Sequence, residues 1–133
     1  MSNTPLDEKT ENHWKNLAPN LVRQRTIIEC TTSEVVGPDQ IKDYIVKLSQ
    51  NVDMKALSEP FAYPAVCTDG KFMGYGGWIH WVTSGAHVYS YPTEPPLFTV
   101  DAYTCKQFSI EKAVQFTRDY FKPKEIVWKD VEV

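Results

Sequence analysis

The segment from residue 78 to residue 105 constrains the fold most, because it holds three strand-like runs joined by short links. The runs are "WIHWVT" (78–83), "HVYSY" (87–91) and "LFTVDAYTC" (97–105), all rich in β-branched and aromatic residues. The links, residues 84–86 and 92–96, are too short for a crossover helix, so neighbouring strands must pair antiparallel. The sequence therefore predicts an antiparallel sheet at the centre of the domain.

Two amphipathic helices are expected on either side of this segment. Residues 37–39, Gly-Pro-Asp, open the first, because proline is tolerated in the first turn of a helix. Its apolar stripe comprises Ile41, Tyr44, Ile45, Leu48 and Val52. Ser109 is the expected N-cap of the second helix, which residues 122–124, Lys-Pro-Lys, bring to an end. The side chains on one face of that helix are Ile110, Ala113, Val114, Thr117 and Phe121.

Three further strand-like runs are residues 21–30, 58–67 and 125–133. Two prolines confine the run 58–67 to the edge of a sheet, because proline donates no hydrogen bond to a ladder. The glycine-rich stretch "DGKFMGYGG" (69–77) predicts a turn. The expected order is β-α-β-β-β-β-α-β, which gives an α+β two-layer sandwich: a mostly antiparallel sheet with two helices on one face. Its other face, uncovered and rich in aromatic residues, is expected to bind a ligand or another copy of the chain.

The 133 residues suit a single domain over 21–133, preceded by a flexible N-terminal arm over 1–20. A net charge of −3 and a pI near 5.6 argue against a nucleic-acid polymer as the partner. No apolar run approaches the length of a membrane helix or a signal peptide, so we expect a cytoplasmic protein. The three cysteines form no CxxC pair, which disfavours both a disulfide framework and a metal site.

Several motifs occur in one order along the chain. They are "GKFMGYGG" (70–77), Gly85-Ala86-His87, Tyr91 to Glu94, "TVDAYTC" (99–105) and "FKPKEIVW" (121–128). In this order they resemble the small prokaryotic S-adenosylmethionine decarboxylases, and the resemblance extends from about Leu21 to the C-terminus. It implies the same sandwich fold and a pocket for a sulfonium nucleoside.

The departures from the family pattern bear on the chemistry. The family has Glu-Ser-His where this chain has Gly85-Ala86-His87, and its serine cleaves the chain to become a pyruvoyl group. Ala86 has no hydroxyl to attack the preceding carbonyl, so we expect no pyruvoyl cofactor. Ser84 lies two residues earlier, roughly 7 Å along a strand, and is the alternative nucleophile. The family's second histidine aligns with Ser90 or Tyr91 and is missing.

The resemblance nominates two groups of site residues. The expected catalytic residues are His87, Cys105 and Glu94. The expected substrate-binding residues are Phe72, Tyr75, Ser84, Tyr89, Tyr91, Asp101 and Tyr103. Aromatic faces stack on adenine and attract a sulfonium cation. Each of these residues has an alternative structural interpretation, as core packing, as solvated surface or as the cover of a subunit interface.

Three functions remain open at this stage. The first is a lyase on S-adenosylmethionine, or on a nucleotide conjugate such as its AMP derivative, that releases a methylthioadenosine moiety and homoserine lactone without a pyruvoyl group. By its reaction it resembles the lyases of phages and CRISPR systems. The second is a non-catalytic binding or regulatory homologue. The third is a pyruvoyl-dependent decarboxylase in a trapped form. In each case the expected partner is a small molecule, with assembly into a dimer or trimer.

Overall fold

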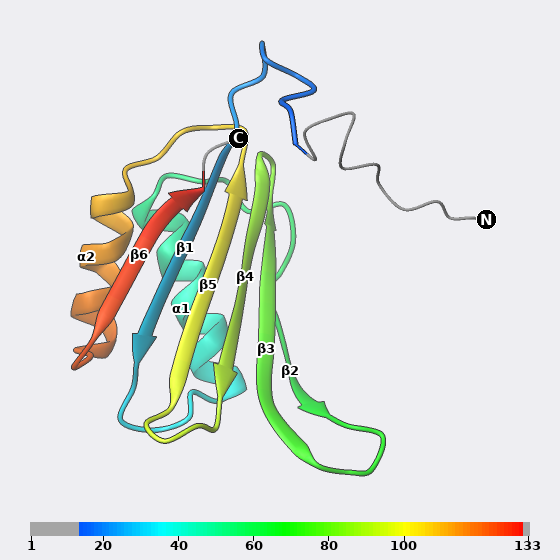
Figure 1. Ribbon diagram of the computed structural model, residues 1–133, viewed down its shortest axis with the longest axis vertical. Helices are drawn as coiled ribbons and strands as arrows, with labels where there is room; N and C mark the ends of the chain where they lie inside the picture. The colour runs from blue at the N-terminus through cyan, green and yellow to red at the C-terminus, as the bar shows by residue number, and fades with distance from the viewer. Residues whose placement is uncertain (1–13, 132–133) are drawn as a thin grey trace, which may run out of the picture.

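The computed structural model describes residues 14–131, in which a six-stranded sheet is backed by two helices (Figure 1). The elements in chain order are β1 (Gln24–Thr31), α1 (Pro38–Asn51), β2 (Phe61–Val66), β3 (Phe72–Trp81), β4 (Ser84–Tyr91), β5 (Leu97–Thr104), α2 (Ile110–Phe121) and β6 (Ile126–Val131). The strands lie in the order β2-β3-β4-β5-β1-β6, and every neighbouring pair is antiparallel. The predicted order and fold class are confirmed. Most of the expected N-terminal arm lies outside the described residues.

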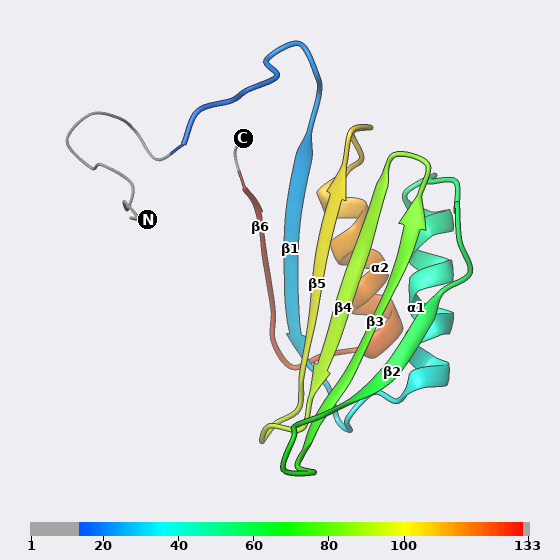
Figure 2. The ribbon, with the colours of Figure 1, turned by 90° about the vertical axis from the view of Figure 1, so that its right-hand side faces the viewer.

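Both helices pack on the same side of the sheet (Figure 2). We call this side the helix-covered face and the opposite side the open face. Strand alternation assigns side chains to one or the other, so that in β4 Ala86, Val88 and Ser90 are buried while His87 and Tyr91 are exposed. None of the helices in residues 14–131 is both long and apolar enough to cross a bilayer.

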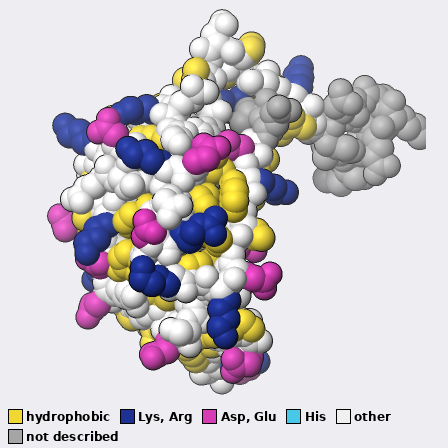
Figure 3. Space-filling view, turned by 90° about the vertical axis from the view of Figure 1, so that its left-hand side faces the viewer, with side chains coloured by type: hydrophobic (Ala, Val, Ile, Leu, Met, Phe, Trp, Pro, Cys, Tyr) yellow, Lys and Arg dark blue, Asp and Glu magenta, His cyan; other side chains and the backbone are white. Residues whose placement is uncertain are grey.

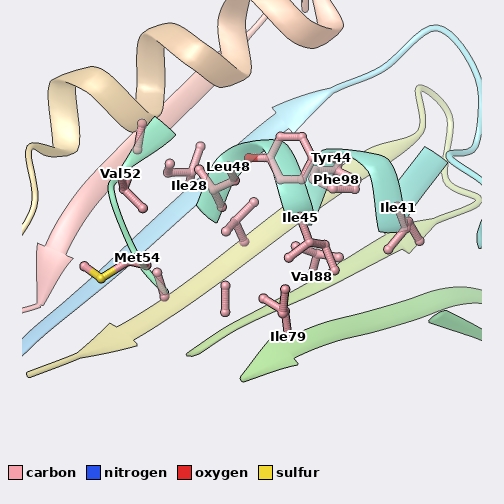
Figure 4. Packing of buried hydrophobic residues seen from close by; sticks show 14 of the residues in the cluster. Ile28, Ile41, Tyr44, Ile45, Leu48, Val52, Met54, Ile79, Val88 and Phe98 are labelled. Atoms are coloured by element: carbon pink, nitrogen blue, oxygen red, sulfur yellow. The ribbon is translucent and has the colours of Figure 1, made fainter. Parts of the chain in front are cut away.

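The core fills the space between α1 and the centre of the sheet (Figure 4). The predicted stripe of α1 is buried in full, and Tyr44 is its largest member, with no exposed surface. The Tyr44 ring meets Phe98 of β5 edge-on at 5.0 Å and Phe121 of α2 at 5.3 Å between centroids. One aromatic side chain therefore joins both helices to the sheet.

Helix boundaries follow the predicted signals. Pro38 is the first residue of α1, and the Ser109 hydroxyl accepts a hydrogen bond from the Lys112 amide at the start of α2. α2 ends at Lys122, whose left-handed backbone has φ 49°. The helix that follows the strand segment is thus fixed at both of its ends by local sequence.

Two sequence predictions were wrong in their bounds. The stretch 72–77 belongs to β3 and is not a turn, and residues 84–86 open β4 and do not form a link. The glycines in these stretches allow close packing. A Cβ on Gly77 would lie 2.5 Å from Cγ2 of Ile41 in α1, and one on Gly85 would lie 2.5 Å from the Ile79 carbonyl oxygen. The turn between β3 and β4 is only Val82-Thr83.

Polar groups in the core are paired with one another. Trp81 is buried at the end of β3, and its indole N–H donates to the Ser49 hydroxyl at 2.8 Å. The Ser49 hydroxyl in turn donates to the Ile45 carbonyl, so the hydroxyl proton has an acceptor within α1. This chain of hydrogen bonds fixes α1 to β3 at a point where both groups are out of contact with water.

We expect Ser49→Ala to lower the free energy of unfolding by about 1–3 kcal/mol, because the buried indole N–H of Trp81 loses its acceptor. Urea denaturation followed by tryptophan fluorescence measures the change. Ser33→Ala, at an exposed position, is the matched control and should change the value by less than about 0.5 kcal/mol. Equal effects of the two substitutions would contradict the role assigned to Ser49.

Candidate functional site

The open face carries a pocket of about 530 Å³ near the turn between β3 and β4. Its lining residues come from three adjacent strands and are Trp78, Ile79, His80, Ser84, Gly85, Ala86, His87, Asp101 and Tyr103. A pocket of this size suits a nucleoside-sized ligand. The aromatic, imidazole and carboxylate groups around it provide both stacking surfaces and hydrogen-bonding atoms.

Strand register brings these distant residues together. Trp78 of β3 pairs with His87 of β4, and His87 pairs with Asp101 of β5. Side chains directly opposite one another in an antiparallel pair have Cβ atoms about 4.5–5.5 Å apart. An indole, an imidazole and a carboxylate therefore form one row across the open face. The His80 ring adds to this row by meeting the Trp78 ring edge-on, at 4.4 Å between centroids.

Tyr103 forms one side of the pocket and carries a cation on its ring. The Arg25 guanidinium of β1 lies 4.0 Å from the centre of the Tyr103 ring, and the two residues are partners in the β1–β5 ladder. Arg25 and His80 were missed by sequence reasoning. Both alternate with buried neighbours on their strands, so the sequence could have indicated that they are exposed on the sheet. Only the pairing of strands shows which side chains they contact.

Positions 84 and 86 both line the pocket but differ in burial and in backbone conformation. Ala86 is 4% exposed and packs in the core on the helix-covered face. Ser84 lines the pocket with φ 129°, a backbone conformation that side chains with a Cβ rarely adopt. The carbonyl oxygen of the preceding residue, Thr83, accepts a hydrogen bond from the Cys105 amide at 2.9 Å.

Some predicted site residues gather at this pocket. Ser84, His87, Asp101 and Tyr103 line it, and Cys105 follows β5 directly beside the β3–β4 turn. Tyr89 and Tyr91 continue along β4 on the open face, with ring centroids 4.4 Å apart. These two tyrosines extend the aromatic surface away from the pocket.

Other predicted residues lie elsewhere in the single chain. Phe72 and Tyr75 contact each other at 5.1 Å near the opposite end of β3, and Tyr75 packs against the core. Trp78, by contrast, points to the open face, away from Tyr75. Glu94 is exposed in the loop after β4, at the far end of that strand from Ser84.

The cysteines differ in their chemistry. Burial raises the pKa of the Cys30 thiol to about 12, so it remains protonated and unreactive at neutral pH. Cys67 and Cys105 are exposed, and all three are free thiols. Within residues 14–131, no three His, Cys, Asp or Glu side chains are arranged to hold a metal ion.

Comparison with known proteins gives one family and one fold. The model of the S-adenosylmethionine decarboxylase family matches residues 26–132. The crystal structure of the adenosylmethionine decarboxylase from Aquifex aeolicus is similar with a TM-score of 0.64, covering 84% of this chain and 90% of that one at 17% identity. At this identity the structural match shows a shared fold. No curated protein sequence matches the chain significantly.

We expect Ser84→Gly to raise the free energy of unfolding by about 1 kcal/mol, because glycine tolerates the positive φ that strains serine. The melting temperature should rise by about 3–5 °C. Ser84→Ala is the matched control: it also removes the hydroxyl but keeps the Cβ, so it should bring no gain. A gain in both variants would assign the effect to the hydroxyl and contradict backbone strain.

Proposed function

Since the chain belongs to the S-adenosylmethionine decarboxylase family, we propose that its open-face pocket binds S-adenosylmethionine or a nucleotide conjugate of it. We further propose that the protein cleaves this ligand without a pyruvoyl group. The observation that carries the proposal is the placement of position 86. Where the resemblance puts the pyruvoyl-forming serine, the pocket has Ala86, which lacks a hydroxyl and is only 4% exposed, beside Trp78, His87 and Asp101.

The pocket has the groups that recognition of a sulfonium nucleoside requires. The Trp78 indole offers a π face to the cation, which contributes roughly 0.5–2 kcal/mol depending on desolvation. The Asp101 carboxylate offers a countercharge on the neighbouring strand, and Tyr103 offers a second ring for stacking. The cation over Tyr103, Arg25, is placed to attract the carboxylate of the ligand.

The proposed reaction is an intramolecular displacement. A carboxylate oxygen of the methionine moiety attacks its own γ-carbon and forms the ring bond of homoserine lactone. The bond from that carbon to sulfur breaks, and its electron pair leaves the sulfur as the neutral thioether of methylthioadenosine. No external base and no oxidant are needed. Holding the tail in the folded conformer supplies on the order of 7–11 kcal/mol in well-oriented reactions of this kind.

His87 has a positioning role in this scheme. Its imidazole pairs across the ladder with Asp101 and with Trp78, between the expected countercharge and the expected stacking surface. The imidazole there can hydrogen-bond to the amino or carboxylate group of the methionine moiety. The tail of the ligand would thereby be held close to its reacting conformation.

Incubation of the purified protein with S-adenosylmethionine, and separately with its AMP conjugate, tests the activity. We expect methylthioadenosine and homoserine lactone from S-adenosylmethionine, or the same two moieties from the conjugate with AMP retained on one of them or released to water, detected by liquid chromatography and mass spectrometry. Binding by calorimetry without either product would favour the non-catalytic homologue. Release of carbon dioxide with decarboxylated S-adenosylmethionine would contradict the lyase directly.

We expect Trp78→Ala to weaken S-adenosylmethionine binding by about 2-fold to about 30-fold, because the cation loses an aromatic face. Isothermal titration calorimetry gives the dissociation constants. Trp128→Ala is the matched control, because Trp128 is similarly exposed, at 44% against 37%, but lies on β6 beside Arg118. Equal losses in the two variants would place the ligand outside the open-face pocket.

The geometry at Ser84 favours a second candidate, the pyruvoyl-dependent decarboxylase. The Ser84 hydroxyl lies at the pocket on a strained backbone, and the Cys105 amide polarises the carbonyl that this hydroxyl would attack. Attack would form an ester at Thr83 and lead to cleavage between residues 83 and 84. Among the described residues, no histidine follows His87 on β4 to assist.

Intact-mass spectrometry of the native protein separates the two candidates. The lyase requires a single chain of 15.3 kDa. Two fragments, with a keto group at the start of the second, would establish the pyruvoyl route, and Ser84→Ala would then abolish cleavage. A single chain after prolonged incubation of the native protein would exclude that route.

We also propose a homo-oligomer assembled through the open face. Trp78, Tyr91 and Tyr63 are exposed large aromatic residues on the strands that form this face. Phe72 and Glu94 are distant from the pocket of their own chain, so they would act on the ligand only from a second copy. Light scattering that gives the monomer mass of 15.3 kDa would contradict this assembly.

A further inference from the structure

A second cleft, of about 690 Å³, opens where β1 begins and β6 ends, beside the N-terminus of α2. The proposed function assigns it no role. The residues along it include Arg23, Gln24, Arg25, Gln107 and Asp130. We propose that this cleft binds the phosphate of a nucleotide-conjugated sulfonium substrate whose sulfonium part occupies the open-face pocket. The inference rests on the proposed function, and it selects the conjugate over free S-adenosylmethionine.

The charges in the cleft favour an anion. The residues along the cleft include two arginines and one acidic residue, Asp130, whose carboxylate already accepts hydrogen bonds from Thr26 and Gln24. Within residues 14–131, neither arginine forms a salt bridge. Arg23 donates from its terminal nitrogen to the Asn16 side chain, but its buried Nε has no partner among the described residues. A guanidinium group without a salt-bridge partner is suited to a phosphate oxygen, because its terminal N–H groups form charge-assisted hydrogen bonds.

The wall of the cleft is held in place without a ligand. The Gln24 side chain donates to the Phe108 carbonyl at 3.2 Å and accepts from the Phe108 amide at 2.9 Å. These two bonds fasten the loop before α2 to β1. The first turn of α2, capped by Ser109, adds the positive end of a helix dipole at the same place, although Glu111 in that turn offsets part of it. The wall formed by Gln24 and Phe108 is therefore pre-positioned.

The two arginines are not part of a broad basic surface. On the side of the molecule that carries α2 and β6, positive and negative side chains are interspersed (Figure 3). The whole chain carries a net charge of −3. Two guanidinium groups that form no salt bridge with the described residues, in a protein of this charge, point to a specific anion and not to a polyanion.

The cleft and the pocket are connected through one pair of residues. Arg25 lines the cleft, and its guanidinium lies 4.0 Å over the Tyr103 ring, which lines the pocket. A ligand with a sulfonium nucleoside at one end and a phosphate at the other can therefore contact both sites around this pair. Free S-adenosylmethionine has no phosphate and leaves the cleft without an anion.

Calorimetry with three probes tests the inference: S-adenosylmethionine, AMP, and the AMP conjugate of S-adenosylmethionine. We expect the conjugate to bind at least about tenfold more tightly than free S-adenosylmethionine, because charge-assisted hydrogen bonds to phosphate are added. The ratio of the dissociation constants of free S-adenosylmethionine and of the conjugate should decrease when the salt concentration rises from about 50 mM to about 300 mM. Equal affinities of conjugate and free S-adenosylmethionine for the native protein would overturn the proposal.

Arg23→Gln is the informative variant, because Arg23 lines the cleft and not the pocket. It should weaken conjugate binding about tenfold and leave free S-adenosylmethionine within about twofold. Lys42→Gln, which removes an exposed charge on α1, is the matched control and should leave both affinities within about twofold. If Arg23→Gln does not fold, Arg23→Lys keeps the charge but loses the fork and should show a smaller loss of the same kind. Equal losses in the Arg23 and Lys42 variants would overturn the proposal.

The probes also distinguish failure of this inference from failure of the proposed function. If free S-adenosylmethionine binds and the conjugate binds no more tightly, the result would support the proposed function and contradict the phosphate site. If AMP binds in a way that depends on Arg23 and S-adenosylmethionine does not bind, the result would support the anion site and contradict the sulfonium pocket. If none of the three probes binds, both proposals fail.

Discussion

Packing of α1 against the middle of the sheet is the interaction on which the rest of the structure depends. Ile41 approaches β3 so closely that residue 77 has space only for a glycine, and Tyr44 links the sheet to α2. Because both helices lie on one face, the strand period of two divides every strand into core and open-face residues. The pocket follows from this division, because its polar and aromatic side chains are those that point to the open face.

The same division governs the chemistry at the start of β4. A shift of one residue along a strand moves a side chain from the pocket to the core, so the position of a hydroxyl matters as much as its presence. Residue 86 contributes only a nearly buried methyl group, whereas Ser84 carries a hydroxyl, lines the pocket and has a backbone φ of 129°. The absence of a hydroxyl at Ala86 is compatible with the proposed pyruvoyl-independent reaction. The hydroxyl of Ser84 is compatible with the alternative proposal, self-cleavage.

Electrostatics divide the proposed ligand-binding surface into two parts. Around Trp78 and Asp101 the groups suit a cation, and around Arg23 and Arg25 they suit an anion. The pairing of β1 with β5 places these parts next to each other, with the guanidinium of one over the tyrosine of the other. A zwitterionic or phosphate-bearing sulfonium compound matches that arrangement better than a ligand of a single charge.

Local patterns in the sequence determined the element order, both helices and their caps, and the edge position of the proline-containing strand. These features depend on periodicity and capping, which act over a few residues. The sequence patterns did not predict where β3 and β4 begin. The glycines in these stretches were interpreted as turn and link signals, whereas in the structure they lie within the strands and allow close packing. Of the candidate site residues, Asp101 and Tyr103 lie two apart on one strand and share a face, which follows from alternation within a strand, a local property. Only the tertiary structure decided that His87 lies between Trp78 and Asp101, that Glu94 is at the far end of the sheet, and that Arg25 covers Tyr103. Those neighbours come from different strands, and their contacts are set by the register that the packed core imposes.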